Sequence, residues 1–385
     1  MLYYNFKDTS ISRLGFGAMR LPVIDGDAGN IDKATTQALI DKAIECGINY
    51  FDTAYSYHLG FSESVLGECL SKHPRDSYYL TSKFPGHESR KIWKPGEIFQ
   101  EQLDRCGVEY FDFYLAHNVT EISIDTYMDK NLGMLDMMIA EKAAGRIKHL
   151  GFSSHGRLDT IKRFMDEYGQ HMEFCQLEIN YLDWTLQESR EKYEYITSLG
   201  LPIWVMEPVR GGKLANLDEE ATKKLRAYRP EESTVSWAFR WLQRLNNVGV
   251  VLSGMNSIEM IEENAATFSE QKPLTDEEAA CIEGIAQGFA NFIPCTACRY
   301  CTKHCPLGLD IPNLLTLAND ALTGASYNVT MGIESLPEDK KPGACLKCGA
   351  CAAVCPQNID IPSALETLQT TADKLTPWHV LRHYD

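Results

Sequence analysis

Eight of the 13 cysteines fall into two runs with identical spacing in the last quarter of the chain. Each run has the pattern C-x2-C-x2-C-x3-C-P, the bacterial ligand pattern for a cubane 4Fe-4S cluster, in which every iron takes one thiolate. Two such runs predict two clusters and therefore a redox protein. The predicted ligands are Cys295, Cys298, Cys301 and Cys305 in the first run and Cys345, Cys348, Cys351 and Cys355 in the second.

The fourth cysteine of each run is expected to bind the other run's cluster, as in ferredoxins that hold two clusters. One cluster is assigned to Cys295, Cys298, Cys301 and Cys355, and the other to Cys345, Cys348, Cys351 and Cys305. A zinc site would favour paired C-x2-C knuckles around a longer loop, and a disulfide framework would suit a small secreted domain. Neither alternative matches a repeated run of four cysteines that ends in proline.

Four ionisable side chains follow short apolar runs earlier in the chain: Asp52, Tyr57, Lys83 and His117. A tyrosine is a poor acid at its ordinary pKa of about 10. A nearby ammonium favours the phenolate and lowers that pKa, and an aspartate keeps the ammonium charged. Each residue alone has a structural explanation, but the four together predict a proton-transfer site.

The elements that would position these residues are short β-rich runs that alternate with amphipathic stretches. The strands are predicted at 14–18, 48–51, 78–82, 111–116, 147–152, 174–179, 202–206 and 248–252. Helices are predicted near 32–46, 62–72, 96–106, 129–144, 157–168, 187–199, 233–245 and 257–268. Eight such pairs predict a (β/α)8 TIM barrel of the α/β class, whose catalytic groups lie at the C-terminal ends of the strands.

The segments before and after the predicted barrel strands also predict local structure. The segment LYYNFKDTSI alternates and turns at Lys7 and Asp8, which predicts a hairpin that closes the barrel floor. A helix is expected to begin at an N-cap Thr275 and to lead out of the barrel. We place the domain boundary between residues 290 and 291, giving a barrel over 1–290 and a cluster domain over 291–385.

The two cysteine runs share a longer frame, C-P-x-x-x-D-I-P-x-x-L. Ile-Pro before apolar residues is typical of a helix start, so helices are predicted from Pro312 to about Ala321 and from Pro362 to about Thr371. The segment between the runs, including 335–344, is predicted to be a solvated loop. Such a mostly α-helical module resembles the ferredoxin-like dicluster domains appended to many anaerobic oxidoreductases.

Charge and hydropathy exclude several functions. The 37 basic and 53 acidic residues give a net charge of -16, which argues against a nucleic-acid partner. The N-terminus lacks the basic and apolar regions of a signal peptide, and no run approaches the 18 apolar residues of a membrane span. We therefore expect a cytoplasmic protein that does not enter a membrane.

At its four ionisable residues the chain resembles the aldo-keto reductase superfamily, and the resemblance extends from GFGAMRLP at 15–22 to SIEMIEENA at 257–265. The family uses NAD(P)H to interconvert carbonyls and alcohols. The resemblance implies that Tyr57 donates a proton to the carbonyl oxygen of a small-molecule substrate. It further implies that Lys83 with Asp52 lowers the pKa of Tyr57, and that His117 orients the carbonyl. Tyr55 does not match the family position.

The resemblance also implies cofactor contacts, although several positions depart from the family. Ser153 and Gln176 match residues that hold the nicotinamide carboxamide, whereas Ser154 replaces an asparagine. Met206 and Glu207 replace the usual Tyr-Ser pair, so a thioether takes the place of the aromatic ring that stacks on the nicotinamide. The family's pyrophosphate loop aligns with Gly211, Gly212 and Lys213, for which an ordinary helix cap is the alternative interpretation.

Near the adenine, Glu263 and Asn264 match the family's glutamate and asparagine. The lysine and arginine that usually clamp the 2'-phosphate of NADPH align with Gly254 and Met260. Without these cations, a phosphate beside Glu259 would be repelled. The sequence therefore favours NADH over NADPH, or else a cofactor that is weakly held.

Three interpretations stay open, because hydride transfer moves two electrons and a 4Fe-4S cluster takes one. In the first interpretation, the chain is a carbonyl reductase whose clusters exchange electrons with a flavoprotein or another redox partner. Alternatively, it is an electron-transfer adaptor whose barrel site is vestigial. In the third interpretation it is a reductase whose clusters are structural or sense oxygen.

Overall fold

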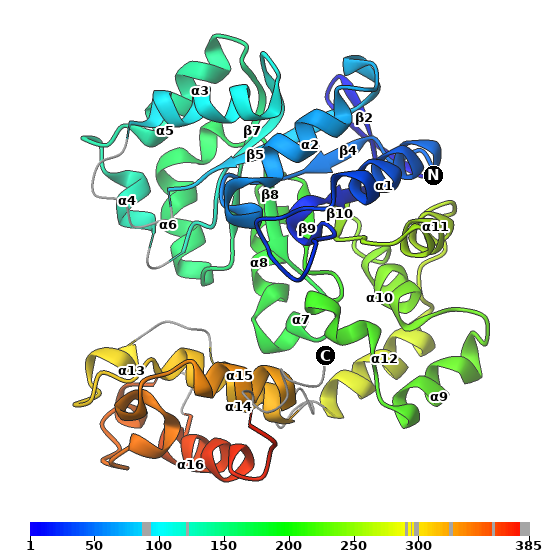
Figure 1. Cartoon of the computed structure of the whole chain (residues 1–385). Helices are drawn as coiled ribbons and strands as arrows, with labels where there is room; N and C mark the ends of the chain where they lie inside the picture. Colours follow the sequence, from blue (N-terminus) through cyan, green and yellow to red (C-terminus); the bar gives the residue numbers. More distant parts are fainter. Residues whose placement is uncertain are drawn as a thin grey trace. The chain divides into compact units, whose positions relative to one another are not determined.

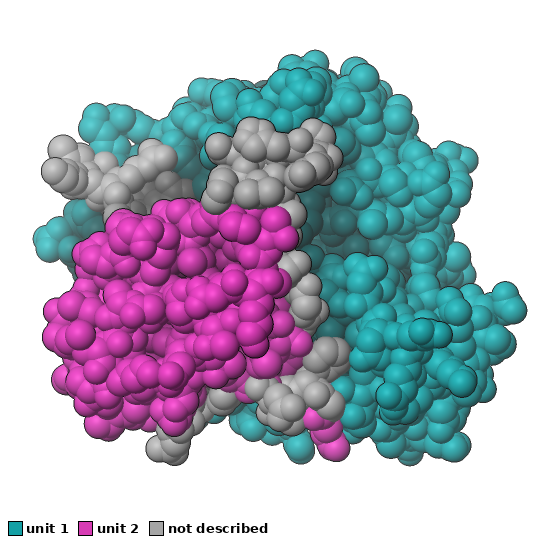
Figure 2. Space-filling view, turned by 60° about the horizontal axis from the view of Figure 1, so that its bottom comes forward, with its two compact units in different colours: residues 1–285 teal, residues 286–385 magenta. Residues whose placement is uncertain are grey.

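The computed structural model describes residues 1–86, 94–120, 123–288, 292–293, 295, 300–322, 326–355 and 359–377. The chain divides into two compact units, residues 1–285 and residues 286–385 (Figure 2). The boundary predicted after residue 290 lies outside the described residues. Among the described helices, none has the length and apolar character needed to cross a membrane.

Eight parallel strands close into a barrel in the first unit (Figure 1). They are β3 (Leu14–Gly17), β4 (Tyr50–Asp52), β5 (Tyr79–Phe84), β6 (Phe111–Ala116), β7 (Ile147–Ser154), β8 (Phe174–Glu178), β9 (Ile203–Met206) and β10 (Val248–Ser253). Each strand pairs with its neighbours in sequence, and β10 pairs with β3 to complete the ring. The predicted TIM barrel and all eight of its strands are confirmed.

The described helices that begin in the first unit mostly follow the predicted positions. They are α1 (Lys33–Glu45), α2 (Ser62–Leu70), α3 (Pro95–Cys106), α4 (Ile124–Met128), α5 (Met134–Ala143), α6 (Leu158–Tyr168), α7 (Asp183–Leu186), α8 (Ser189–Ser198), α9 (Glu219–Tyr228), α10 (Thr234–Leu242), α11 (Ile258–Thr267) and α12 (Asp276–Gly288). Helix α12 begins as predicted, since the Glu278 backbone N–H donates to Thr275 Oγ1 at 3.2 Å. The sequence prediction missed α9, which buries only a narrow stripe that includes Ala221 and Leu225.

A hairpin closes the N-terminal end of the barrel, as predicted. Its strands β1 (Tyr3–Phe6) and β2 (Thr9–Ser12) pair antiparallel, and Lys7 makes the turn with a φ of 52°. Phe6 packs against Trp204 and Phe113 inside the barrel, with ring centroids 5.3 and 5.9 Å apart. Because aromatic side chains fill this end, the chemistry belongs at the opposite end, where the strands finish.

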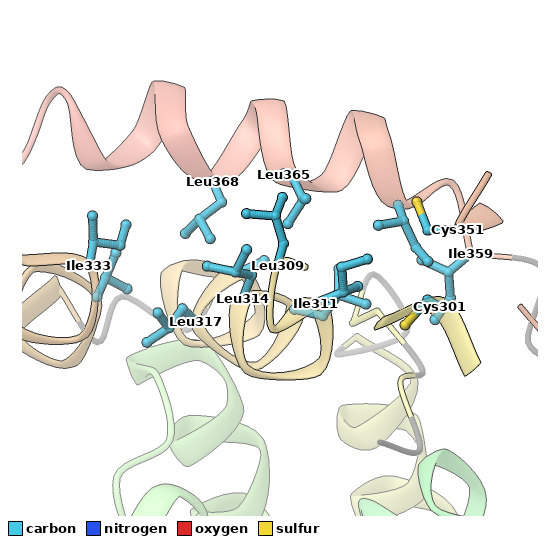
Figure 3. Packing of buried hydrophobic residues seen from close by; sticks show 14 residues of the cluster. Cys301, Leu309, Ile311, Leu314, Leu317, Ile333, Cys351, Ile359, Leu365 and Leu368 are labelled. Atoms are coloured by element: carbon cyan, nitrogen blue, oxygen red, sulfur yellow. The ribbon is translucent and has the colours of Figure 1, made fainter. Parts of the chain in front are cut away.

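The second unit is built around two helices that pack against each other, α14 (Ile311–Leu322) and α16 (Ile361–Ala372). Both confirm the predicted helices that follow the cysteine runs. Figure 3 shows their core, in which Leu314, Leu365 and Leu368 meet and which also includes Cys301 and Cys351. The cysteine runs therefore join directly to the apolar core of this unit.

The prediction of a loop between the two runs is wrong in part. Helix α15 (Ser326–Glu334) lies there and packs against α14. Val329 and Ile333 are one helical turn apart and both are buried in the core of the unit. Burial of this single apolar face stabilises a helix that its Gly332 and β-branched residues disfavour. The following segment contains only short 3-10 turns, η6 (Glu338–Lys340) and η7 (Pro342–Ala344).

Candidate active site and cluster site

The barrel brings three of the predicted catalytic side chains into direct contact. Asp52 ends β4, Lys83 lies near the end of β5, and Tyr57 begins the turn η2 (Tyr57–Gly60). Lys83 Nζ lies 2.5 Å from Asp52 Oδ1 and 3.3 Å from the Tyr57 phenol oxygen. Its third contact is the carbonyl oxygen of Thr53, at 2.8 Å. All three ammonium protons therefore have acceptors.

Burial dominates the electrostatics of this group. The side chains of Lys83 and Asp52 are 0% and 4% exposed. Burial lowers the pKa of Lys83, but Asp52 and Tyr57 more than offset this effect, so the pKa lies above its ordinary value. The pKa of the Asp52 carboxyl is raised because burial outweighs the attraction of Lys83. Lys83 thus stays an ammonium at neutral pH.

The pKa of Tyr57 corrects one expectation. Burial raises this pKa above its ordinary value, and the opposing effect of Lys83 is smaller, while Asp52 and Glu207 add to the rise. From the charges of Lys83 and Asp52 alone, the sequence predicted a net decrease of this pKa. Tyr57 is therefore a neutral phenol at neutral pH, which suits a proton donor.

His117 follows the end of β6 and lies beside Tyr57. The two rings are nearly perpendicular, with centroids 5.9 Å apart. The His117 backbone carbonyl accepts a hydrogen bond from the Tyr127 hydroxyl at 2.8 Å. A substrate oxygen placed next to the Tyr57 hydroxyl would therefore have an imidazole nearby.

Tyr55 makes its contacts with helix α3. Its hydroxyl donates to Glu101 at 3.1 Å, and the Arg105 guanidinium lies 4.2 Å from its ring centroid. Behind β5, the buried Gln102 amide donates to the Lys83 carbonyl at 3.1 Å. Sequence reasoning missed Gln102 and the Thr53 carbonyl, because backbone acceptors and the amides that fix them have no distinctive sequence signal.

The residues expected at the nicotinamide line the ends of β7, β8 and β9. Ser153 Oγ accepts from the Asn118 backbone N–H at 2.8 Å, and Ser154 Oγ donates to the Val119 carbonyl at 2.6 Å. Gln176 Nε2 lies 3.6 Å from Met206 Sδ. Within the described residues, Gln176 Oε1 is buried without a hydrogen-bond partner. A buried amide of this kind fits a ligand with its own amide, as nicotinamide has.

The residues expected at the pyrophosphate and at the adenine of the cofactor lie on two separate elements. Gly211, Gly212 and Lys213 lie in the turn η5 (Arg210–Ala215) after β9. Glu263 and Asn264 lie on α11 after β10. Glu263 is exposed, whereas Asn264 is buried and donates to Ser253 Oγ at 3.3 Å. Of this last pair, only Glu263 therefore presents its side chain to solvent.

Four cysteine side chains in the second unit line one apolar cavity. They are Cys305 from the first run and Cys345, Cys348 and Cys351 from the second. The cavity walls include Leu309, Ile311 and Leu365. The Cys345 sulfur also accepts from the Lys347 backbone N–H at 3.4 Å. Four thiols around an apolar space fit a cubane cluster, whose irons take one thiolate each.

The other four predicted ligands are described only in part, since Cys298 lies outside the described residues. Cys301 is buried in the core, and Cys295 and Cys355 pack against it. The helix α13 (Tyr300–Lys303), which carries Cys301, contacts η8 (Ala352–Val354), which precedes Cys355. Among the described residues, no three His, Cys, Asp or Glu side chains converge closely enough to hold a single metal ion.

A closed barrel with Asp, Tyr, Lys and His at its C-terminal end, joined to a cysteine-rich lobe, defines a barrel oxidoreductase with an iron-sulfur domain. The model of the aldo/keto reductase family matches residues 13–287, and the model of a 4Fe-4S dicluster domain matches residues 294–359. The chain belongs to the aldo/keto reductase family. Its members use NAD(P)H and act on small carbonyl compounds.

Individual relatives cover the barrel. The NADH-specific methylglyoxal reductase of Escherichia coli is 24% identical over 323 residues, which span 73% of this chain and 96% of the relative. The L-galactose dehydrogenase of Arabidopsis thaliana is 24% identical over 309 residues, 73% of this chain and 92% of the relative. The holo form of an aldo-keto reductase from Bacillus halodurans superposes with a TM-score of 0.60 at 25% identity, covering 74% of this chain and 96% of that one.

Proposed function

We propose that this protein is an NADH-linked carbonyl reductase in which Tyr57 is the general acid and the two clusters connect the enzyme to a redox partner. The contacts of Lys83 carry the proposal, since the ammonium lies within 3.3 Å of the Tyr57 hydroxyl. A buried cation, held by a carboxylate and placed against a phenol, is a costly arrangement for structure alone. It is well suited to proton transfer at that phenol.

Each side chain has a defined part in this reaction. The bound nicotinamide cofactor supplies the hydride. Tyr57 gives its proton to the oxygen of the substrate, and Lys83 stabilises the phenolate that remains. Asp52 keeps Lys83 charged, and the His117 imidazole orients the substrate oxygen. Gln176 and Ser153 hold the carboxamide, and Ser154 fixes the loop beside it.

NADH is proposed as the preferred cofactor. Gly254 and Met260 provide no cation for a 2'-phosphate, and Glu259 adds negative charge on the same helix, α11. The name of the Escherichia coli relative, an NADH-specific methylglyoxal reductase, supports the same direction. We accordingly propose a small carbonyl compound as the substrate.

The cluster domain is proposed to begin near residue 291 and to hold two 4Fe-4S clusters with exchanged fourth cysteines. The cavity lined by Cys305 together with three cysteines of the second run supports this assignment. When bound, the clusters exchange single electrons. A flavoprotein is the proposed partner class, because flavins convert between one-electron and two-electron steps.

Anaerobic titration with NADH tests the link between the two units. In the wild type we expect the cluster absorbance to bleach in the presence of the partner and to recover on addition of a carbonyl substrate. Tyr57→Phe should lose carbonyl reduction. Clusters that never respond would assign them a structural or oxygen-sensing role. A wild type without any carbonyl reduction would favour the electron-transfer adaptor.

A further inference from the structure

His58, the residue after Tyr57, joins the η2 turn to the loop that follows the neighbouring strand β3. Its ring nitrogen Nε2 accepts a hydrogen bond from the Leu21 backbone N–H at 3.0 Å. Its other ring nitrogen, Nδ1, lies 2.9 Å from the Ala28 carbonyl oxygen. A backbone N–H only donates and a carbonyl only accepts, so both bonds form with one tautomer, whose proton is on Nδ1. One imidazole therefore contacts two points of the segment 21–31, which we call the support loop.

The support loop is held together by its own contacts. Val23 and Ile31 form an antiparallel bridge. The Ile24 backbone N–H donates to the Asn30 carbonyl at 2.8 Å. Leu21 and Ile31, at the two ends of the loop, are buried. The loop therefore has a conformation of its own, against which the η2 turn can be fixed.

The η2 turn, in contrast, is strained. His58 and Leu59 have φ values of 51° and 55°, in the left-handed region that glycine adopts readily and other residues adopt at a cost in free energy. The Leu59 side chain is largely exposed, so its burial offsets little of this cost. A strained turn persists only when its surroundings hold it in place. The two hydrogen bonds of His58 provide such contacts.

We propose that His58 is a positioning residue that keeps the Tyr57 phenol against Lys83; this rests on the proposed role of Tyr57 as the general acid. Because the two residues are adjacent, a change in the backbone at His58 moves the Tyr57 side chain. The phenol oxygen lies 3.3 Å from Lys83 Nζ, already long for a hydrogen bond, so a small shift separates them. A displacement of about 1 Å can lower the rate of a reaction by ~100-fold. His58 acts through Tyr57 and transfers no proton itself.

Replacing His58 with glycine separates positioning from strain. Glycine adopts the left-handed conformation readily, so His58→Gly removes both hydrogen bonds without forcing the turn. We expect the kcat of carbonyl reduction to fall by roughly 10- to 100-fold. The Kd of NADH, measured by isothermal titration of the full-length holoprotein, should stay unchanged, because His58 bonds only to the support loop.

Two further variants complete the comparison. His58→Gln should retain part of the rate, because its amide oxygen can accept from the Leu21 backbone N–H in place of Nε2. His73→Gly is the matched control, since the His73 imidazole is also hydrogen-bonded, to the exposed Asp41 at 2.8 Å. This control should react like the wild type. Thermal unfolding of each variant measures the fraction that is folded.

Hydrogen exchange gives a measurement that does not depend on turnover. The Tyr57 backbone N–H donates to the Ala54 carbonyl at 3.2 Å, and the Leu21 backbone N–H donates to His58. Both amides should exchange faster in His58→Gly than in the wild type. In His58→Gln both should exchange more slowly than in His58→Gly.

The outcomes distinguish this assignment from the proposed function. An unchanged kcat in His58→Gly would overturn the assignment, and so would a loss of activity that only matches a loss of folded protein. Faster exchange at Leu21 alone, with Tyr57 unchanged, would limit His58 to the support loop and also overturn it. A wild type that reduces no carbonyl would refute the proposed function. In that case faster exchange of the Tyr57 amide in His58→Gly, reversed in His58→Gln, would still support the positioning role, and unchanged exchange would overturn it.

Discussion

Replacing Lys83 with methionine should destabilise the barrel more strongly than replacing an exposed lysine. Lys83→Met removes the ammonium that contacts Asp52 at 2.5 Å and the Thr53 carbonyl at 2.8 Å, and both acceptors are buried. Removing one partner of a buried pair typically costs about 3–5 kcal/mol, because the other charge is left uncompensated. Lys33, which pairs with Glu68 at 2.6 Å but is 60% exposed, provides the control. Lys33→Met should cost about 1 kcal/mol or less.

The double variant Asp52→Asn/Lys83→Met separates stability from catalysis. Once both charges are gone, no uncompensated ion remains, so the double variant should lose less than the sum of the two single variants. Urea unfolding followed by barrel tryptophan fluorescence, including the buried Trp204, measures each step. Carbonyl reduction should stay impaired in all three variants. A Lys83→Met protein within about 1 kcal/mol of the wild type would refute the buried pair.

Lys83→Met should also change the pH dependence of the reaction. Lys83 lowers the pKa of Tyr57 against the larger effect of burial, so its removal raises that pKa further. Alcohol oxidation needs Tyr57 as a phenolate and therefore increases with pH through this pKa. In any residual activity of Lys83→Met, the midpoint of that increase should move to higher pH. A midpoint that stays fixed or moves down would show that Lys83 does not act on Tyr57.

Four further outcomes are expected. Tyr57→Phe should lower NADH-dependent carbonyl reduction by ~100-fold or more, the usual effect of a positioned general acid, whereas Tyr55→Phe loses only its bond to Glu101 and should remain active. Iron and sulfide analysis after anaerobic reconstitution should approach about eight of each per chain, and Cys305→Ser should damage the cluster of the second run; one or two zinc ions instead would contradict the assignment. NADPH should bind no more tightly than NADH, and Met260→Arg should improve NADPH selectively; tenfold tighter NADPH binding by the wild type would mean that a cation reaches the 2'-phosphate from elsewhere. Hydrogen bonds from Arg229 hold the pKa of Glu278 at about 2, so this carboxylate stabilises the fold above pH ~4.5 and that contribution disappears as the pH falls toward 2; acid unfolding of Glu278→Gln should lack this component.

The sequence predicted the barrel because its strands and its helices carry separate signals. Each strand is an apolar β-rich run, and several of the intervening helices end at a glycine such as Gly107, which adopts the left-handed conformation at the end of α3. The grouping of Asp52, Lys83 and Tyr57 followed from the rule that residues just after barrel strands lie at one end of the barrel. Helix α9 had a signal that was not used, since Asp218 caps it through the Ala221 backbone N–H.

Other features depend on three-dimensional packing. The direction of the Tyr57 pKa requires knowing how deeply the phenol is buried, and the chain order of charges does not contain that information. Helix α15 forms because Val329 and Ile333 meet an apolar surface that α14 and α16 provide.

The shared cavity of Cys305 and the second cysteine run also bears on how the protein matures. With the exchange of fourth cysteines proposed above, the first run alone would not complete either cluster, although it carries a full set of four cysteines. A nascent chain that ends before Cys345 would hold only partial sites. Cluster insertion is therefore expected after synthesis of Cys355, and the duplicated halves of this domain form one unit of assembly that cannot be loaded in halves.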